Sequence, residues 1–371
     1  MAHFEVYALL RVSPRHTDVM TRGKPAFALG HRPALDGLRA IAVLLVILTH
    51  AGVPYLGQAG AVGVTMFFVL SGFLITRLLL EEQQRSGRIN FRRFYVRRVR
   101  RLLPALLTLL FLDGLVRAAS GQSLIPVALA ASYMSNIAPS AFGVMFRELE
   151  HTWSLSLEEQ FYLLWPVLLV LLVRTRYAML ALVTGVIASA AIRVGLWAGG
   201  ADAARIYIAP DTRADALIVG CLLGFTIHTI HRPGRITATA AAVTLAAFCT
   251  FGYVGILWAL LPAAACAAVL IAWSLDHRGW LASRPLVFVG RISYGLYLWH
   301  YPVALVVRHH LGVAGLPVTV AISVVLAVMS WYCVELPFMR HATGADGKGT
   351  DEAQNSIADP PPIGQIVRTL P

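Results

Sequence analysis

The first long apolar stretch of the sequence contains an arginine, Arg39, and a histidine, His50, eleven residues apart. In an α-helix this spacing brings two side chains back to within roughly 20° of one face, about 16 Å apart along the axis. A charge at mid-membrane costs roughly 2.5–3.5 kcal/mol on insertion scales, so such residues usually line functional cavities. Histidine is the side chain best suited to move a proton near neutral pH. The pair therefore indicates a cationic entrance at Arg39 leading to a general base at His50. The alternative is a hydrogen-bonded structural histidine.

Two adjacent carboxylates, Glu158 and Glu159, open a later apolar stretch. Neighbouring residues of a helix point about 100° apart, so at most one of the two faces a given site, and the sequence does not say which. Stabilisation of a helix N-terminus by acidic groups is the alternative interpretation. Earlier in the chain, Ser71-Gly72 makes a small polar break in an aromatic stretch, which permits close helix approach. We identify no base near Ser71 in the sequence, so we do not predict that Ser71 is a nucleophile.

Three further polar residues lie where lipid disfavours them. Arg213 and Asp215 enter an apolar stretch, and His300 lies in the aromatic segment Tyr297–Pro302. Internal pairing of Arg213 with Asp211 or Asp215 is the structural alternative to a functional role for Arg213. For His300 the alternative is an interfacial position beside aromatic residues of the membrane boundary.

Residues 77–101 contain nine arginines and only two acidic residues, Glu81 and Glu82. Asn90 is a suitable N-cap, and apolar residues recur after it at helical spacing. We therefore predict an amphipathic helix that runs into the next apolar stretch. Two interpretations of its charge stay open: an anchor on anionic lipid, and a cytoplasmic site for a polyanionic cofactor.

The elements that position these residues are membrane helices. Of the 371 residues, 57% are hydrophobic and 13% are charged, against about 45–50% and 25% in average soluble chains. With a mean hydropathy of +0.68, this excludes a soluble globular enzyme, a disordered chain, a coiled coil and a small disulfide scaffold. We predict an all-α polytopic membrane protein, since each span needs roughly 20 apolar residues. The ten expected spans are 38–52, 61–80, 99–117, 155–173, 178–198, 214–230, 237–254, 257–275, 287–307 and 314–336.

Charge sets the expected topology. If the weak apolar run at 123–137 does not cross, the loops on the side of the N-terminus hold 23 of the 31 Lys and Arg residues, and the opposite loops hold four. Basic residues collect on the cytoplasmic side of membrane proteins. Both termini are therefore expected in the cytoplasm, and the net charge of +12 reflects topology, with no nucleic-acid partner predicted.

The chain divides into three predicted parts. Residues 1–31 form an N-terminal extension that is expected to be flexible and does not read as a signal peptide, with translation starting at Met1 or Met20. Residues 32–340 form the integral-membrane domain, and residues 341–371, rich in Gly, Asp and Pro, form a cytoplasmic tail that is expected to be disordered. The four cysteines are widely spaced in apolar runs, so neither a disulfide nor a metal site is predicted.

Several of these segments are ordered motifs. They are Leu35-Asp36-Gly37-Leu38-Arg39 with His50, Phe67-Phe68 followed by Ser71-Gly72-Phe73, Arg97-Arg98-Val99-Arg100-Arg101, Trp153–Tyr162, Arg213-x-Asp215, Ile292–His300 and Glu335-x-Pro337. Over roughly residues 32–340 the chain resembles the membrane-bound acyltransferase 3 family, bacterial O-acyltransferases that modify sugars, glycans and some antibiotics.

The resemblance implies a ten-helix fold in the bacterial inner membrane and an acyl-CoA donor, most often acetyl-CoA, taken from the cytoplasm. Arg39 and His50 match the family's essential pair, and the cluster at 97–101 matches its Arg-x-x-Arg element. We accordingly assign catalysis to His50 with Glu158 or Glu159. The assigned donor contacts are Arg39, Ser71, Arg97, Arg98, Arg100 and Arg101, and the assigned acceptor contacts are Arg213, Asp215 and His300.

The expected reaction moves an acyl group to a hydroxyl of a carbohydrate, a glycan, or a glycosylated or macrolide-type small molecule. The rival hypothesis is a proton-coupled transporter or flippase, because intramembrane Arg, His and Glu also suit such carriers. The sequence shows no repeat between its halves and no matching pair of broken helices, which argues against a transporter. The acceptor and the oligomeric state stay open.

Overall fold

The computed structural model of the protein describes residues 29–138, 149–277 and 279–340. The tail at 341–371 and all but the last three residues of the predicted extension lie outside these ranges. Within them the chain is helical, with no strand. The α-helices are α2 (Pro33–His50), α3 (Ala59–Ser86), α4 (Phe91–Ala119), α5 (Ile125–Ala131), α7 (Thr152–Leu172), α8 (Ala178–Ala198), α9 (Ala203–Ile208), α10 (Pro210–Thr226), α11 (Arg235–Phe248), α12 (Tyr253–Ser274), α13 (Arg284–Arg291), α14 (Ser293–Leu311), α15 (Leu316–Ser330) and α16 (Leu336–Arg340).

The expected all-helical membrane architecture is confirmed. In the described part of the chain, seven helical segments are long and apolar enough to cross a membrane. Each of the ten predicted spans overlaps a helix, but α10 and α11 are short, and α14 and α15 fall within one long segment, Ser293–Met339. The count of ten and the side of each terminus therefore stay predictions. The weak run at 123–137 contains only the seven-residue α5, which is too short to span the hydrocarbon core.

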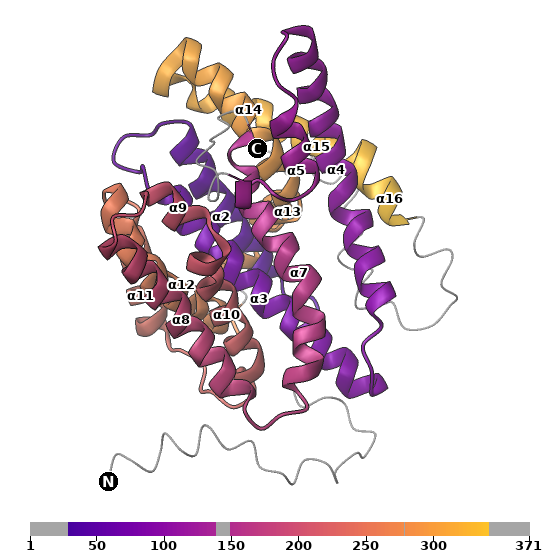
Figure 1. The fold of residues 1–371 in the computed structure, drawn as a ribbon, viewed down its shortest axis with the longest axis vertical. Helices are drawn as coiled ribbons and strands as arrows, with labels where there is room; N and C mark the ends of the chain where they lie inside the picture. Colours follow the sequence, from indigo (N-terminus) through magenta and orange to yellow (C-terminus); the bar gives the residue numbers. More distant parts are fainter. Residues whose placement is uncertain (1–28, 139–148, 278, 341–371) are drawn as a thin grey trace.

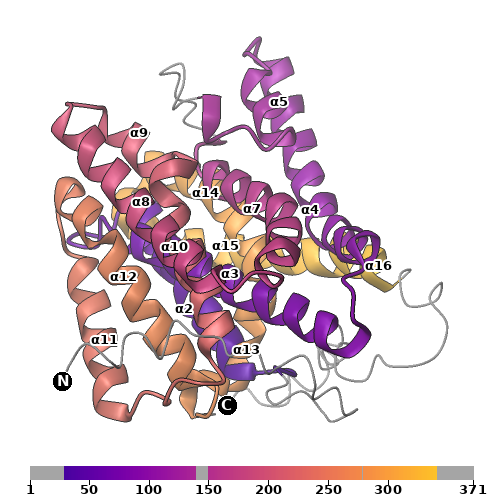
Figure 2. The same cartoon turned by 60° about the horizontal axis from the view of Figure 1, so that its bottom comes forward.

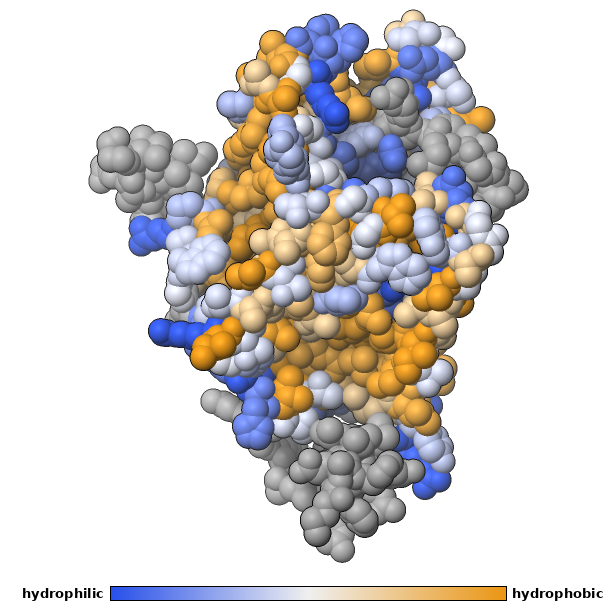
Figure 3. Space-filling model, turned by 90° about the vertical axis from the view of Figure 1, so that its left-hand side faces the viewer, coloured by the Kyte–Doolittle hydropathy of each residue, from blue (hydrophilic) through white to orange (hydrophobic). Residues whose placement is uncertain are grey.

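The outer surface is apolar where a lipid-facing surface is expected. Helix α7, for example, leaves Leu163, Leu164 and Leu168 exposed. Figure 3 shows one face of the molecule, on which many apolar side chains lie across the middle, while polar side chains gather towards the two ends.

Helices α2, α3 and α10 form the centre of the bundle, with α8, α11 and α12 on one side and α4 and α16 on the other (Figures 1 and 2). Glycines allow a close approach between α3 and α10. A Cβ atom on Gly72 would lie 2.1 Å from the carbonyl oxygen of Leu217, and one on Gly220 would lie 2.2 Å from that of Val69. The close helix approach predicted at Ser71-Gly72 is therefore confirmed.

Helix ends follow their sequence signals. The side chain of Asn90 accepts a hydrogen bond from the backbone N–H of Arg93 at 2.9 Å, as predicted for the N-cap of α4. Helix α3 ends before Gly87, which adopts a left-handed conformation with φ 71°. Gly312, with φ 56°, lies between α14 and α15, and these two helices pack against each other.

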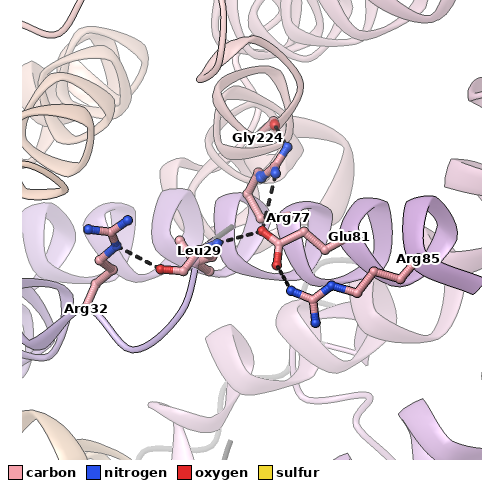
Figure 4. A network of polar contacts seen from close by, with 6 residues as sticks. All are labelled: Leu29, Arg32, Arg77, Glu81, Arg85 and Gly224. Carbon is pink, nitrogen blue, oxygen red and sulfur yellow. Dashed lines mark hydrogen bonds and ion pairs between the residues drawn. The ribbon is translucent and has the colours of Figure 1, made fainter. Parts of the chain in front are cut away.

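A buried polar network joins the start of α2 to the end of α3 (Figure 4). Glu81 accepts a hydrogen bond from the backbone N–H of Leu29 at 2.8 Å and pairs with Arg77 at 3.3 Å. Arg77 also reaches the carbonyl oxygen of Gly224, in the last turn of α10. Because both charges are almost fully buried, each needs the other as a partner. The network therefore holds the arginine-rich end of α3 against α2 and α10.

Candidate active site

Arg39 and His50, the first pair of candidate residues from the sequence, both contact helix α14. Arg39 donates from Nε to the hydroxyl of Ser293 at 3.3 Å, and the ring of His50 lies against His300, with 3.1 Å between His50 Nδ1 and His300 Nε2. Ser293 and His300 both belong to α14. Arg39 and His50 therefore share a face of α2, as their spacing predicts, and they mark two ends of one candidate site.

At the Arg39 end, α4 contributes arginines from the cluster at 97–101. The guanidinium of Arg98 lies 3.3 Å from the centroid of the Tyr162 ring. Arg101 interacts electrostatically with Arg39, Arg98 and Glu335. Arg98 Nε is buried and has no hydrogen-bond partner among the described residues, so a donor is left for an anionic or carbonyl group. Arg97 and Arg100 are half-buried, and their assignment stays a prediction.

Ser71 lies beside these arginines and contacts a carboxylate. It donates a hydrogen bond to Glu158 Oε1, and the hydroxyl of Tyr162 lies 2.8 Å from Ser71 Oγ and 3.1 Å from the same carboxylate oxygen. Arg98 and Arg39 both interact electrostatically with Glu158. No base lies near Ser71 in the sequence, but the packing of α3 on α7 brings Glu158, 87 residues further along the chain, into contact with it.

Glu159 faces a different neighbour. Its carboxylate acts on Tyr133, in the segment after α5, where burial and this negative charge together raise the pKa of the Tyr133 hydroxyl. Of the two adjacent carboxylates, the structure thus joins Glu158, and not Glu159, to Ser71. Glu158 lies at the arginine end of the site, where Arg98 and Arg39 act on it.

At the His50 end there is a partly open cavity of about 560 Å³. Its polar lining consists of His50, Glu150, Tyr301, Arg308 and His309, and its apolar lining is Ala304 and Leu305. Tyr301 donates a hydrogen bond to Glu150 at 3.1 Å. The cavity therefore presents an imidazole, a carboxylate and a guanidinium to one space, a set that suits a ligand rich in hydroxyl groups.

A third histidine, His151, completes the aromatic surroundings of His50. Its ring stacks on Tyr301 with centroids 4.7 Å apart and an interplanar angle of 22°. Burial, together with the neighbouring His50 ring, lowers the pKa of His151 to about 3, so this ring stays neutral at physiological pH. His151 is not among the residues predicted for the site, although it directly precedes the segment beginning Thr152-Trp153.

Comparison with known proteins identifies the chain. Residues 32–335 match the protein family described as an acyltransferase domain. The chain belongs to the membrane-bound acyltransferase 3 family. The resemblance inferred from the motifs is therefore confirmed. Family membership also confirms the prediction that the protein is an acyltransferase. Membership favours acyl transfer over the rival transporter.

Three curated relatives are named as O-acetyltransferases. One is the "Putative peptidoglycan O-acetyltransferase YrhL" of Bacillus subtilis, 32% identical, covering 82% of this chain and 54% of that protein. A second is the "Putative O-acetyltransferase SAS0844" of Staphylococcus aureus, 32% identical, covering 85% and 58%. A third is the "Peptidoglycan O-acetyltransferase OatA" of Listeria monocytogenes, 29% identical, covering 90% and 60%. This acyltransferase chain thus spans 54–60% of the length of these relatives. No solved structure matches it.

The motif Arg213-x-Asp215 of this acyltransferase is buried. Arg213 lies among the rings of Phe68, Trp153 and Tyr207 and donates to the hydroxyl of Thr65 at 3.2 Å. Asp215 pairs with Arg193 at 2.5 Å, and Asp211 pairs with Arg205 at 2.7 Å, so the carboxylates considered as partners of Arg213 pair with other arginines.

Arg213, Asp215 and His300 are not among the residues that line the described cavity. Their assignment as acceptor contacts in the acyltransferase stays a prediction. All four cysteines are free thiols. Within the described residues no group of three or more His, Cys, Asp or Glu side chains could hold a metal ion.

Proposed function

We propose that this acyltransferase moves an acyl group, most often acetyl, from acyl-CoA to a hydroxyl of a carbohydrate or glycan, with His50 as the general base. The observation that carries the proposal is the position of His50 on the wall of a polar cavity. The same helix, α2, carries Arg39 to the arginine cluster at its other end. One helix thus connects a site for an anionic donor to a site for a hydroxyl acceptor.

The donor end binds by charge. Arg39, Arg98 and Arg101 form a cationic group, and the unpartnered Arg98 Nε supplies a donor for charge-assisted hydrogen bonds to phosphate oxygens. The pantetheine arm of CoA is long enough to carry a thioester from these arginines towards His50, about 16 Å away along a helix of this geometry. Glu158 and Ser71 lie beside the arginines and border this path.

The acceptor end performs the proton transfer. The imidazole of His50 takes the proton from the acceptor hydroxyl while the oxygen bonds to the acyl carbon. The C–S bond of the thioester then breaks, the imidazolium of His50 returns the proton to the departing thiolate, and the products are an ester and the free thiol of CoA. Glu150, Arg308 and His309 line the same cavity and orient the hydroxyl-bearing acceptor.

The acceptor class is supported by both the lining and the relatives. Carboxylate and guanidinium groups hydrogen-bond to several hydroxyls at once, and two of the relatives are named as peptidoglycan O-acetyltransferases. We therefore propose an envelope glycan as the acceptor and the bacterial inner membrane as the location.

Labelled acetyl-CoA tests the proposal in membranes from cells that express the wild-type chain, His50→Ala or the control variant His231→Ala. His231 is exposed in the segment after α10 and is not among the residues that line the cavity. We expect label in the glycan fraction with wild type and the control, and none with His50→Ala. Equal labelling by His50→Ala, at equal protein level, would overturn the role of His50.

A further inference from the structure

His300 touches His50 without sharing its cavity. The His300 side chain is fully buried, and it is absent from the lining of the described cavity. One of its ring nitrogens, Nδ1, lies 3.1 Å from the carbonyl oxygen of Leu296 on its own helix. The other, Nε2, lies 3.1 Å from His50 Nδ1.

These contacts determine where the ring protons lie. A carbonyl oxygen only accepts hydrogen bonds, so His300 Nδ1 carries the proton that is donated to Leu296. A neutral imidazole has one N–H, and His300 Nε2 is therefore an acceptor. The same argument applies to His50, whose Nδ1 lies 3.0 Å from the carbonyl oxygen of Val46. The His50 N–H therefore lies on Nδ1, between two acceptors, Val46 and His300.

A hydrogen bond donated by His300 to His50 would require a buried positive charge on His300. If His300 Nε2 donated to His50, both nitrogens of His300 would be protonated, and an imidazolium would lie fully buried without a carboxylate among the contacts described above. The cost of placing an unpaired charge in such surroundings is high. Neutral rings with both protons on Nδ1 satisfy every contact and leave the Nε2 lone pair of His50 free.

We infer that His300 is a positioning residue for His50. Its Nε2 accepts a hydrogen bond from the Nδ1–H of His50 and so fixes the orientation of the His50 ring. This keeps the Nε2 lone pair of His50 directed at the hydroxyl of the acyl acceptor. When His50 takes a proton from the hydroxyl, the acceptor nitrogen of His300 stabilises the resulting imidazolium. A neutral histidine here takes the place that a carboxylate has beside the histidine of a catalytic triad. The inference rests on the proposed role of His50 and changes that of His300, which the sequence analysis assigned to acceptor binding.

Activity of two His300 variants tests the inference. His300→Leu removes the hydrogen-bond acceptor of His50 Nδ1–H. Turnover should fall about 10- to 100-fold, by analogy with the loss when the orienting partner of a metal-bound histidine is removed, with the KM for acetyl-CoA unchanged. His300→Gln places an amide oxygen near the lost nitrogen and should restore most of the turnover. His310→Leu, an exposed position on the same helix, is the matched control. An equal loss of turnover in the Gln and Leu variants would overturn the positioning role. So would unchanged turnover with a higher KM for the hydroxyl-bearing substrate.

A spectroscopic measurement on the wild-type protein does not depend on the variants folding. In protein labelled with ¹⁵N-histidine, the ring correlations of His50 and His300 should show protonated Nδ1 and unprotonated Nε2 in both rings. A protonated His300 Nε2 would overturn the inference. Loss of activity in His50→Ala tests the role of His50 separately, so failure of the proposed function and failure of the positioning role give different results.

Discussion

At the scale of single residues, Glu158 and Glu159 are adjacent in sequence and differ in their surroundings. Glu158 accepts hydrogen bonds from Ser71 and Tyr162 and interacts with Arg39 and Arg98, whereas Glu159 shares only the interaction with Arg98 and acts on Tyr133. Hydrogen bonds to a charged group contribute about 1.5–3 kcal/mol. Glu158→Gln should therefore lower kcat/KM for acyl-CoA roughly 10- to 100-fold, and Glu159→Gln much less. Steady-state kinetics of the two matched variants check this. A larger loss for Glu159→Gln would mean that the site uses the other carboxylate.

Arg98 distinguishes the two interpretations of the arginine-rich segment. Arg98→Met removes the buried, unpartnered Nε and should raise the KM for acyl-CoA roughly 10-fold or more, since charge-assisted hydrogen bonds to phosphate are lost. Arg88→Met removes an exposed arginine of the same segment and should leave this KM unchanged. If both variants changed the KM equally little and both weakened attachment to the membrane, the segment would be a lipid anchor instead.

Contacts within one helix could be predicted from the sequence, whereas contacts between helices could not. The Arg39–His50 pair could be predicted because both residues lie on one helix, where periodicity determines direction. The contact of Ser71 with Glu158 could not, because it joins two helices whose relative rotation is fixed by packing. His151 was missed for a similar reason: it precedes α7, and only the position of α14 brings its ring against Tyr301.

At the scale of elements, the distance between α3 and α10 depends on glycine. A Cβ on Gly72 meets a backbone oxygen at 2.1 Å, and backbone cannot move aside as a flexible side chain can. Gly72→Ala should destabilise the protein by about 1–3 kcal/mol, the usual cost of overpacking. The matched change Gly195→Ala, in α8 with nothing within 4 Å, should be neutral or stabilising by up to about 1 kcal/mol. Thermal unfolding in detergent compares the two variants. Equal stability would contradict the close packing of α3 on α10.

The existence of these helices could be predicted from unbroken apolar runs, but their breaks could not. The predicted span 287–307 covers the end of α13 and most of α14, which are separate helices around Ile292. The span 314–336 continues from α15 into the π-helical turn Trp331–Glu335. Single polar residues, Arg291 and Glu335, mark these changes, but the apolar runs around them are long enough that hydropathy averages over both. The directions of the segments follow from tertiary contacts.

At the scale of the whole molecule, the arginine end and the cavity end are predicted to face opposite sides of the membrane. Tyr55, between α2 and α3 at the cavity end, is 88% exposed, and Ser86 is exposed at the arginine end. In a background without the four native cysteines, Tyr55→Cys should react with an impermeant maleimide in intact cells. Ser86→Cys should react only after lysis, because basic segments stay in the cytoplasm. The reverse pattern would invert the topology.

The central claim is that one site takes its donor from the cytoplasmic side and serves its acceptor through the cavity of His50. Sealed inverted vesicles, which expose the cytoplasmic face, test it most directly when labelled acetyl-CoA is added outside them. The account predicts labelled glycan protected in the vesicle lumen with the wild-type chain, and none with His50→Ala or with right-side-out vesicles. Label that forms equally in vesicles of either orientation, or that persists in His50→Ala, would contradict it.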